Sequence, residues 1–418
     1  MALRFSIPRI TTSLYPADIM AVLIAASLPW STSLPAIFVG LWLVALVPTI
    51  DIDSFMRLAK RPICVLPVAF FGLALVGTLW SSSPWNTRLY YVGPLAKLLV
   101  IPLLFYHFQR STRGVWVFAA FLVSCSLLMA LSWIVAVEPR LALRADAYYG
   151  VPVKNYIDQS QEFALCTIGL AYMIVQQWQN RQPLRAVLLA ALAVAFFTNM
   201  TFIVVSRTAL VTMPVMLGVF VFLHLNRRNM IAVLGTVVVI VTAIWFASPS
   251  LRERTATIFT QYHAYETSNE VTSAGMRLEF WRKSLHFFRD APLIGHGTGS
   301  VRELFVEAAA GQTGVSAEVI ANPHNQTLYV AVQWGAVGVI ILYAMWLCHL
   351  LLFRGATLAH WVGLLVVVQN MTTSIFNSHL FDFHEGWMYV LGVGVAGGIV
   401  LAKEASMSSI TRQSGNPA

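Results

Sequence analysis

The chain has 418 residues, of which 58% are hydrophobic and only 11% are charged, and its mean hydropathy is +0.70. A soluble domain carries about a quarter charged residues, so this composition excludes an ordinary soluble fold. The formal charge of +9 would suggest nucleic acid as the partner of a soluble protein, but in a membrane protein Lys and Arg mark the loops on one side. We therefore expect membrane lipids as partners and no nucleic acid.

Long apolar runs fill most of the chain. A bilayer core is about 30 Å thick, and polar backbone groups in lipid must be satisfied internally, so we interpret these runs as transmembrane helices. The interpretation is an all-α polytopic membrane protein with about twelve spans, although eleven or thirteen stay open. The spans are expected at residues 17–31, 34–50, 63–80, 91–108, 115–137, 161–178, 186–204, 208–225, 229–247, 324–350, 356–375 and 386–402.

The short loops predict the orientation. With twelve spans, their Lys and Arg residues fall on one side together with both termini, and the positive-inside rule assigns that side to the cytoplasm. These loop residues are Arg57, Lys60, Arg61, Arg110, Arg113, Arg181, Arg185, Arg227, Arg228 and Arg354. One missed helix would destroy this agreement, so it supports the count of twelve.

One long polar stretch interrupts the apolar runs, and it divides the chain into four parts. We expect a bundle of about nine helices over 1–247, a periplasmic helical subdomain over 248–323, further membrane helices over 324–402, and a cytoplasmic tail over 403–418, disordered after Ala405. The subdomain contains an amphipathic pattern over 276–289. The glycines of 295–300 resemble a phosphate loop only superficially and are better interpreted as a turn.

His324 is the first candidate for chemistry. Asn322 is expected to cap the following helix and Pro323 to occupy its first position, which places His324 in the first turn. The positive end of the helix dipole disfavours the imidazolium form, so a neutral His324 would suit the role of general base. The alternative is an interfacial histidine that only makes hydrogen bonds.

Two arginines are the next candidates. Arg207 lies between two strongly apolar runs, where a cation is costly unless it reaches the interface or binds an anion. Arg277 begins the amphipathic helix, and a guanidinium can bind a phosphate through two parallel hydrogen bonds. The alternatives are a snorkelling arginine at 207 and a solvated or salt-bridged helix face at 277, where Glu279 and Asp290 are available partners.

Further polar residues are weaker candidates for substrate binding. They share positions in the loops predicted on the outer side or at the ends of predicted spans, where an ordinary interfacial role is the alternative for each. They are Arg88, Arg144, Lys154, Arg282 and Asp382.

The sequence gives no sign of a metal site or a cofactor. The four cysteines, Cys64, Cys125, Cys166 and Cys348, lie inside apolar runs, and no pair has metal-ligand spacing. Acidic residues are scarce in the predicted spans, which disfavours a proton-coupled pump.

Short motifs around the long loop resemble those of a known family. Arg207 to Leu210 matches an Arg-x-x-x-Leu motif only in part, because Val211 occupies the fourth position. Arg277 is followed by the aromatic pair Phe280 and Trp281. Residues 292–297 look like a Pro-Leu-x-Gly-x-Gly element, and 324–328 match His-Asn-x-x-Leu. In this order, the motifs resemble the bacterial O-antigen ligase family, which shares a superfamily with O-antigen polymerases and certain protein O-oligosaccharyltransferases.

The resemblance implies glycan transfer at the periplasmic face of the bacterial inner membrane. It implies an undecaprenyl diphosphate-linked O-antigen as donor, lipid A–core as acceptor, inversion at the anomeric carbon, and no metal or cofactor. His324 would then be the general base, and Arg207 and Arg277 would bind the diphosphate. An O-antigen polymerase or related oligosaccharyltransferase is the nearest alternative, and a transporter of lipid-linked sugars is a third hypothesis.

Overall fold

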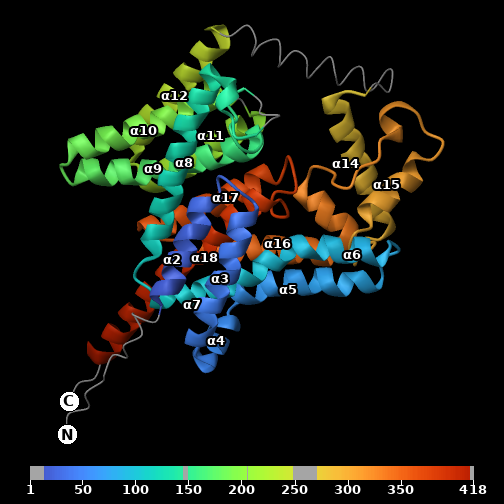
Figure 1. Ribbon diagram of the computed structural model, residues 1–418, viewed down its shortest axis with the longest axis horizontal. Helices are drawn as coiled ribbons and strands as arrows, with labels where there is room; N and C mark the ends of the chain where they lie inside the picture. The colour runs from blue at the N-terminus through green and yellow to red at the C-terminus, as the bar shows by residue number, and fades with distance from the viewer. Residues whose placement is uncertain (1–13, 145–148, 205, 248–270, 415–418) are drawn as a thin grey trace.

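The computed structural model describes residues 14–144, 149–204, 206–247 and 271–414 (Figure 1). Every regular element in these ranges is a helix, which confirms the all-α prediction. Six of these helices are long and apolar enough to cross a membrane, or seven if the bent pair Ser33–Thr49 and Ile52–Ala59 forms one span. The chain is therefore a multi-pass membrane protein, and the count of twelve crossings stays a prediction.

The helices lie where the apolar runs predicted them. Each of the twelve expected spans coincides with a helix, and the run at 91–108 is shared between α7 and the 3₁₀ segment η3 (Gly93–Leu99) that precedes it. Before the long loop the helices are α2 (Tyr15–Ser27), α3 (Ser33–Leu46), α4 (Ile52–Ala59), α5 (Pro62–Val76), α6 (Trp85–Val92), α7 (Val100–Arg110), α8 (Gly114–Val137), α9 (Tyr156–Gln179), α10 (Pro183–Phe202), α11 (Arg207–His224) and α12 (Arg227–Ala247). After it come α14 (Ser273–Asp290), α15 (Val301–Ala309), α16 (Gln326–Leu352), α17 (Leu358–Thr373) and α18 (Phe383–Ser414).

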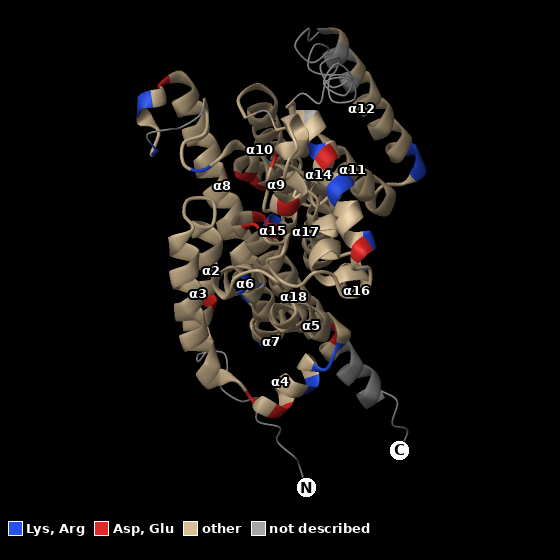
Figure 2. Ribbon diagram, turned by 90° about the vertical axis from the view of Figure 1, so that its right-hand side faces the viewer, with Lys and Arg blue, Asp and Glu red and all other residues tan. Residues whose placement is uncertain are grey.

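Two ends of the molecule can be distinguished in Figure 1. The turn between α9 and α10 and the end of α18 lie at the left, whereas α14 and α15 lie together at the right. In the turned view of Figure 2, α4 lies at the lower end, away from α14 and α15. The amphipathic helix predicted at 276–289 is α14, and it is separated in space from the turn between α9 and α10 and from the end of α18.

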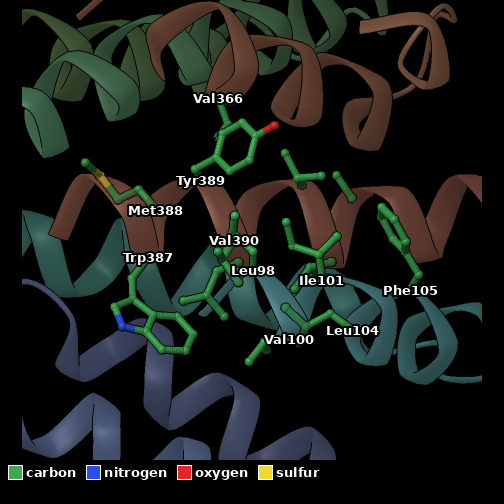
Figure 3. Close-up of a cluster of buried hydrophobic side chains, with 14 of the residues drawn as sticks. Leu98, Val100, Ile101, Leu104, Phe105, Val366, Trp387, Met388, Tyr389 and Val390 are labelled. Carbon is green, nitrogen blue, oxygen red and sulfur yellow. The ribbon is translucent and has the colours of Figure 1, made fainter. Parts of the chain in front are cut away.

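The main core is built around the contact between α7 and α18. Figure 3 shows side chains of η3 and α7 facing side chains of α18, among them Ile101 and Tyr389, both fully buried. The helices approach closely because α18 carries glycines at the contact: a Cβ on Gly394 would lie 2.5 Å from Leu104. Small residues at such contacts let membrane helices pack backbone to backbone. This contact fixes α18, and the loop that carries Asp382 leads into that helix.

A separate core holds the polar subdomain against the membrane helices. It consists of Phe280 and Phe287 from α14, Phe305 from α15, and Tyr329 and Val332 from α16, together with Val301. Phe305 makes edge-to-face contacts with Phe280 and Phe287, at 5.9 and 5.4 Å between ring centroids. Because the start of α16 belongs to this core, α14 is positioned directly beside the residues that precede α16.

The glycines of 295–300 form a structural turn, as the sequence predicted. Gly295 and Gly297 have φ values of +66° and +90°, and a Cβ at either position would lie within 2.6 Å of the backbone of Gln333 or Ser81. Only glycine tolerates both the conformation and the approach. The turn is thereby wedged between α16 and the segment after α5, which ties the subdomain to the membrane helices.

One sequence expectation about the fold is wrong. The tail was expected to be disordered after Ala405, but α18 continues through Ser414. Lys403, Glu404 and Ala405 are good helix formers, so the helix of the last span can extend beyond its apolar part.

Candidate functional site

His324 does not lie in a helical turn, which corrects one expectation. Asn325 caps α16, with its Oδ1 accepting the Leu328 N–H at 3.0 Å, and the helix begins at Gln326. His324 precedes the cap in a left-handed conformation with φ of 53°. The Asn322 side chain holds this conformation by accepting the His324 N–H at 2.9 Å. Asn322 thus forms a local turn instead of the helix cap, because the cap position is taken by Asn325.

A network of hydrogen bonds links the His324 ring to the loop before α18. His324 Nδ1 lies 3.1 Å from Asn377 Oδ1, and Asn377 Nδ2 donates to Asp382 Oδ2 at 2.8 Å. The Asn322 amide also donates to Asn377 Oδ1 at 3.1 Å, and Ser378 Oγ donates to Asn322 Oδ1 at 2.8 Å. Two loops far apart in the sequence therefore form one polar site, of which Asp382 is a part.

The network selects one tautomer of His324. A carboxylate only accepts hydrogen bonds, so Asp382 fixes the Asn377 amide with its nitrogen towards Asp382 and its oxygen towards the histidine. Nδ1 of His324 must then carry the proton and donate it to Asn377. This leaves Nε2 with a lone pair. Within the described part of the chain, no hydrogen bond engages Nε2.

The surroundings keep this ring neutral. Burial lowers the pKa of His324 below its ordinary value of 6.5, and the charge of Arg277 lowers it further, while the bond to Asn377 and the charge of Asp382 act in the opposite direction. The direction agrees with the sequence expectation, but burial replaces the helix dipole as its main cause. A half-buried neutral imidazole with a free Nε2 has the properties of a general base.

The start of α14 lies beside His324. The ring of Phe280 stacks on the histidine ring at 6.4 Å between centroids and an interplanar angle of 30°. Arg277 lies one turn earlier on the same helix, is exposed, and is close enough for its charge to act on His324. The structure therefore brings together His324, Arg277 and Asp382, three of the residues that the sequence indicated.

A second layer supports the loop that carries Asp382. His379 Nδ1 donates to Asp382 Oδ2 at 3.0 Å. The buried ammonium of Lys97 donates to the main-chain carbonyls of Phe381, at 3.2 Å, and of Asp382. Gly386 makes room for this ammonium, because a Cβ there would lie 2.1 Å from Lys97 Nζ. The ammonium of Lys97, in η3, thus holds the main chain of this loop in place.

Arg207 is the first residue of α11, and Ser206 caps this helix through a 3.5 Å bond from the Ala209 N–H. The side chain of Arg207 lies outside what the structure describes. Its proposed role in binding a diphosphate stays a prediction.

Three of the weaker candidates have structural partners of their own. Arg88 donates to the carbonyls of Ser83 and Thr78 at 2.5 and 2.8 Å. Lys154 pairs with the buried Glu162 at 3.3 Å. Arg282 forms a two-pronged pair with Glu279, at 2.8 and 2.6 Å.

Arg144, the fourth weaker candidate, is exposed at the end of the described segment 14–144. The four weaker candidates other than Asp382 do not belong to the hydrogen-bond network around His324.

One cluster in the described residues has the composition of a metal site. Nδ1 of His379 and carboxylate oxygens of Asp382 and Glu385 all lie within 4.8 Å of one another. Two of these groups are engaged with each other, since Asp382 accepts hydrogen bonds from Asn377 and His379, and the Lys97 ammonium contacts the adjoining main chain. Among the described residues, Oε1 of the buried Glu385 has no hydrogen-bond partner and lies 3.6 Å from His379 Nδ1. A cation here would meet that ammonium. The expectation that transfer needs no metal stays a prediction.

Comparison with known sequences agrees with these motifs. The sequence model of the family described as O-antigen ligase matches residues 192–343, a range that contains Arg207, Arg277 and His324. The match covers 152 of the 418 residues, and it supports membership of the chain in the superfamily of O-antigen ligases and polymerases. A similar protein is an uncharacterized protein of Haemophilus influenzae, 27% identical over 144 residues. This alignment covers 33% of the chain and 36% of the Haemophilus protein, so the chain spans about a third of the length of that relative.

Sequence reasoning missed residues that orient the His324 ring. Asn377 and His379 were not among the candidates, although Asp382, which was, lies in the same loop. A polar run inside an otherwise apolar region, such as Asn377-Ser378-His379, is a usable signal. His384 itself faces another helix, where its Nδ1 lies 2.7 Å from Asp158.

Proposed function

We propose that the chain is a glycosyltransferase that moves O-antigen from undecaprenyl diphosphate to lipid A–core, acting at the periplasmic face of the bacterial inner membrane. The observation that carries the proposal is the chain of hydrogen bonds from Asp382 through Asn377 to Nδ1 of His324. It favours a neutral histidine with its lone pair on Nε2, which is what the attack of a sugar hydroxyl requires.

The chemistry divides between the base and the arginines. Nε2 of His324 takes the proton of the acceptor hydroxyl as its oxygen bonds to the anomeric carbon of the donor. The bond from that carbon to the diphosphate oxygen breaks, and the electron pair leaves with undecaprenyl diphosphate. A single displacement of this kind inverts the anomeric centre. Arg277, and with it Arg207, would stabilise the negative charge that develops on the leaving group.

The charge of Arg277 then has two effects on one reaction. The guanidinium of Arg277 would bind the diphosphate, and its charge disfavours a second positive charge on His324 before the substrate arrives. The Asn377 amide is neutral, so it stabilises the imidazolium that forms during transfer less than a carboxylate in direct contact would. Asp382, one residue further along the network, supplies a negative charge at greater distance.

The decisive experiment uses purified protein with lipid-linked O-antigen and lipid A–core. We expect transfer by the wild type with EDTA present as well as absent, and loss of transfer by His324→Ala with unchanged thermal stability. Lys at position 277 should restore transfer only partly relative to Ala, because an ammonium lacks the planar pair of donors. Transfer by His324→Ala at the wild-type rate would exclude the assignment of the base, and loss of activity on chelation would exclude the metal-free mechanism.

The same assay separates the alternatives. A polymerase would extend glycan on the lipid carrier and leave lipid A–core unmodified. A transporter would catalyse no transfer in detergent, where no membrane gradient exists. In cells, loss of a ligase leaves long glycan on the carrier, whereas loss of a polymerase leaves single repeats on the core.

A further inference from the structure

A cavity lies along α14, beyond the part of the helix that contacts His324. It measures about 510 Å³ and is bounded by α14, the end of α15 at Ala308, the turn at Gln312, and η5 (Gly314–Ala317). Its volume falls within the range of pockets that bind small ligands. Phe287 and Ala308 are its apolar lining residues.

Cations dominate the polar lining of this cavity. Arg282, Lys283 and Arg289 line it together with a single carboxylate, Glu279. Glu279 is fully buried and already paired with Arg282 through two hydrogen bonds. The charges of Lys283 and Arg289 are therefore in excess, and the cavity has a net charge of +2 with His286 neutral.

Lys283 is a buried cation that lines the cavity. Only 7% of the residue is exposed, yet it lines the cavity. Its Nζ donates to the Ser316 carbonyl at 2.5 Å and lies 5.6 Å from the centre of the Phe305 ring. A buried ammonium is costly unless negative charge accompanies it. An ammonium has three donors, so Lys283 can give further hydrogen bonds to a ligand oxygen.

The cavity and His324 are connected by α14. Phe280, which stacks on His324, precedes Lys283 by less than one helical turn, and Arg289 lies roughly 13 Å beyond Phe280 at 1.5 Å per residue. A ligand that presents a hydroxyl group to His324 can therefore place an anionic group, a few sugars away, in the cavity.

We propose that the cavity between α14 and α15 binds an anionic group, a phosphate or a carboxylate, on the oligosaccharide of the acceptor. The inference rests on the proposed function, because it names the part of the acceptor that this chain recognises away from the reacting hydroxyl. Phosphate on a phospholipid headgroup has the same chemistry, so the experiment has to separate the two sources.

The test measures binding, which does not depend on transfer. Purified full-length protein in detergent is titrated with soluble phosphorylated core oligosaccharide, with the same oligosaccharide after dephosphorylation, and with vesicles of anionic phospholipid. Arg289→Gln and Lys283→Met are compared with Arg302→Gln, which removes an exposed arginine of α15 that does not line the cavity. Because Lys283 is buried, its variant also needs a thermal melt. Arg289 is exposed, so we expect its replacement to leave the fold intact.

We expect Arg289→Gln to raise the Kd for the phosphorylated oligosaccharide by about threefold to tenfold. The dephosphorylated form should bind wild type and Arg289→Gln alike, and Arg302→Gln should behave as wild type. An unchanged Kd in both cavity variants would overturn the inference, as would binding of anionic vesicles that competes with the oligosaccharide. If the oligosaccharide binds through the cavity but is never glycosylated, the proposed function fails while the site stands.

Discussion

At the scale of single residues, Asn377 controls which nitrogen of His324 can accept a proton. Replacing Asn377 by Leu removes the acceptor for Nδ1–H, so the ring can adopt the unproductive tautomer or rotate. We predict that Asn377→Leu lowers kcat by about a hundredfold, the range of general-base catalysis, with little change in the KM for the donor.

The double variant provides the control for this prediction. A residue that acts only through His324 has no further effect once the histidine is gone. Adding Asn377→Leu to His324→Ala should therefore cause no further decrease in kcat. An additive loss would show that Asn377 acts on the fold or on the substrate instead.

The pH dependence of transfer should report the charge of Arg277. His324 must be neutral to accept a proton, so activity falls as pH drops through its pKa, which lies below the ordinary 6.5. Arg277 contributes to that lowering, so Arg277→Gln should raise the pKa and move the acid limb of kcat/KM to higher pH. Arg302→Gln, on the neighbouring helix, should leave the limb in place. A shift of the limb to lower pH in Arg277→Gln would contradict the electrostatic argument.

Which residues the sequence could predict depends on distance along the chain. His324 and Arg277 were identifiable because each belongs to a short motif. Asn377 was not, since its bond to His324 joins positions 53 residues apart and the sequence contains no local trace of that pairing. His379 contacts Asp382, only three residues away, but its role follows from the place of Asp382 in the network. The cap was misassigned for a related reason: Asn322 and Asn325 are both good cap residues, and only the structure shows that Asn325 takes the position.

At the scale of elements, η3 can hold the loop before α18 only because residue 386 is a glycine and leaves room for the Lys97 ammonium. A Cβ at Gly386 would collide with Lys97 Nζ at 2.1 Å and with the Leu380 carbonyl at 2.6 Å. We predict that Gly386→Ala destabilises the protein by about 1–3 kcal/mol and reduces transfer, because the loop carrying Asp382 must move.

A matched substitution separates crowding from helix propensity. Gly72 lies inside α5, and a Cβ there would meet nothing within 4 Å. Gly72→Ala should therefore leave the melting temperature unchanged or raise it slightly. Equal melting temperatures for the two alanine variants would show that the loop is not held against Lys97 in this way.

The positions of the helices were predictable because a continuous apolar run determines a membrane helix by itself. The breaks within the helices could not be predicted from the sequence. The residue Gly335 interrupts α16 with φ of 59° and ψ of −156°, and Thr327 on one side of the break contacts Tyr343 on the other at 3.0 Å between their hydroxyl oxygens. The break packs against residues 292–294: a Cβ on Gly335 would lie 2.4 Å from the Leu293 backbone, and the next two N–H groups of α16 donate to the carbonyls of Pro292 and Leu293. No local pattern in α16 indicates this contact.

At the scale of the whole molecule, the arrangement in Figure 1 makes the predicted sidedness testable. The turn between α9 and α10 and the subdomain of α14 and α15 lie at different ends, and the proposed function requires the subdomain to face the periplasm. Gln182, in that turn, and Gln312, after α15, are both exposed and suit the attachment of a label. The native cysteines would first be replaced, since Cys348 is only partly buried.

In a cysteine-free background, we predict that a membrane-impermeant maleimide reacts with Gln312→Cys once the outer membrane is permeable, and with Gln182→Cys only after the inner membrane is opened. The reason is the positive-inside rule: the arginines beside Gln182 keep that turn in the cytoplasm, while the subdomain has nearly balanced charges. Arg277→Cys should follow Gln312→Cys, because Arg277 lies on α14 of the same subdomain. Labelling of all three positions from one side would mean that a crossing has been miscounted, and His324 would then lose its access to a periplasmic acceptor.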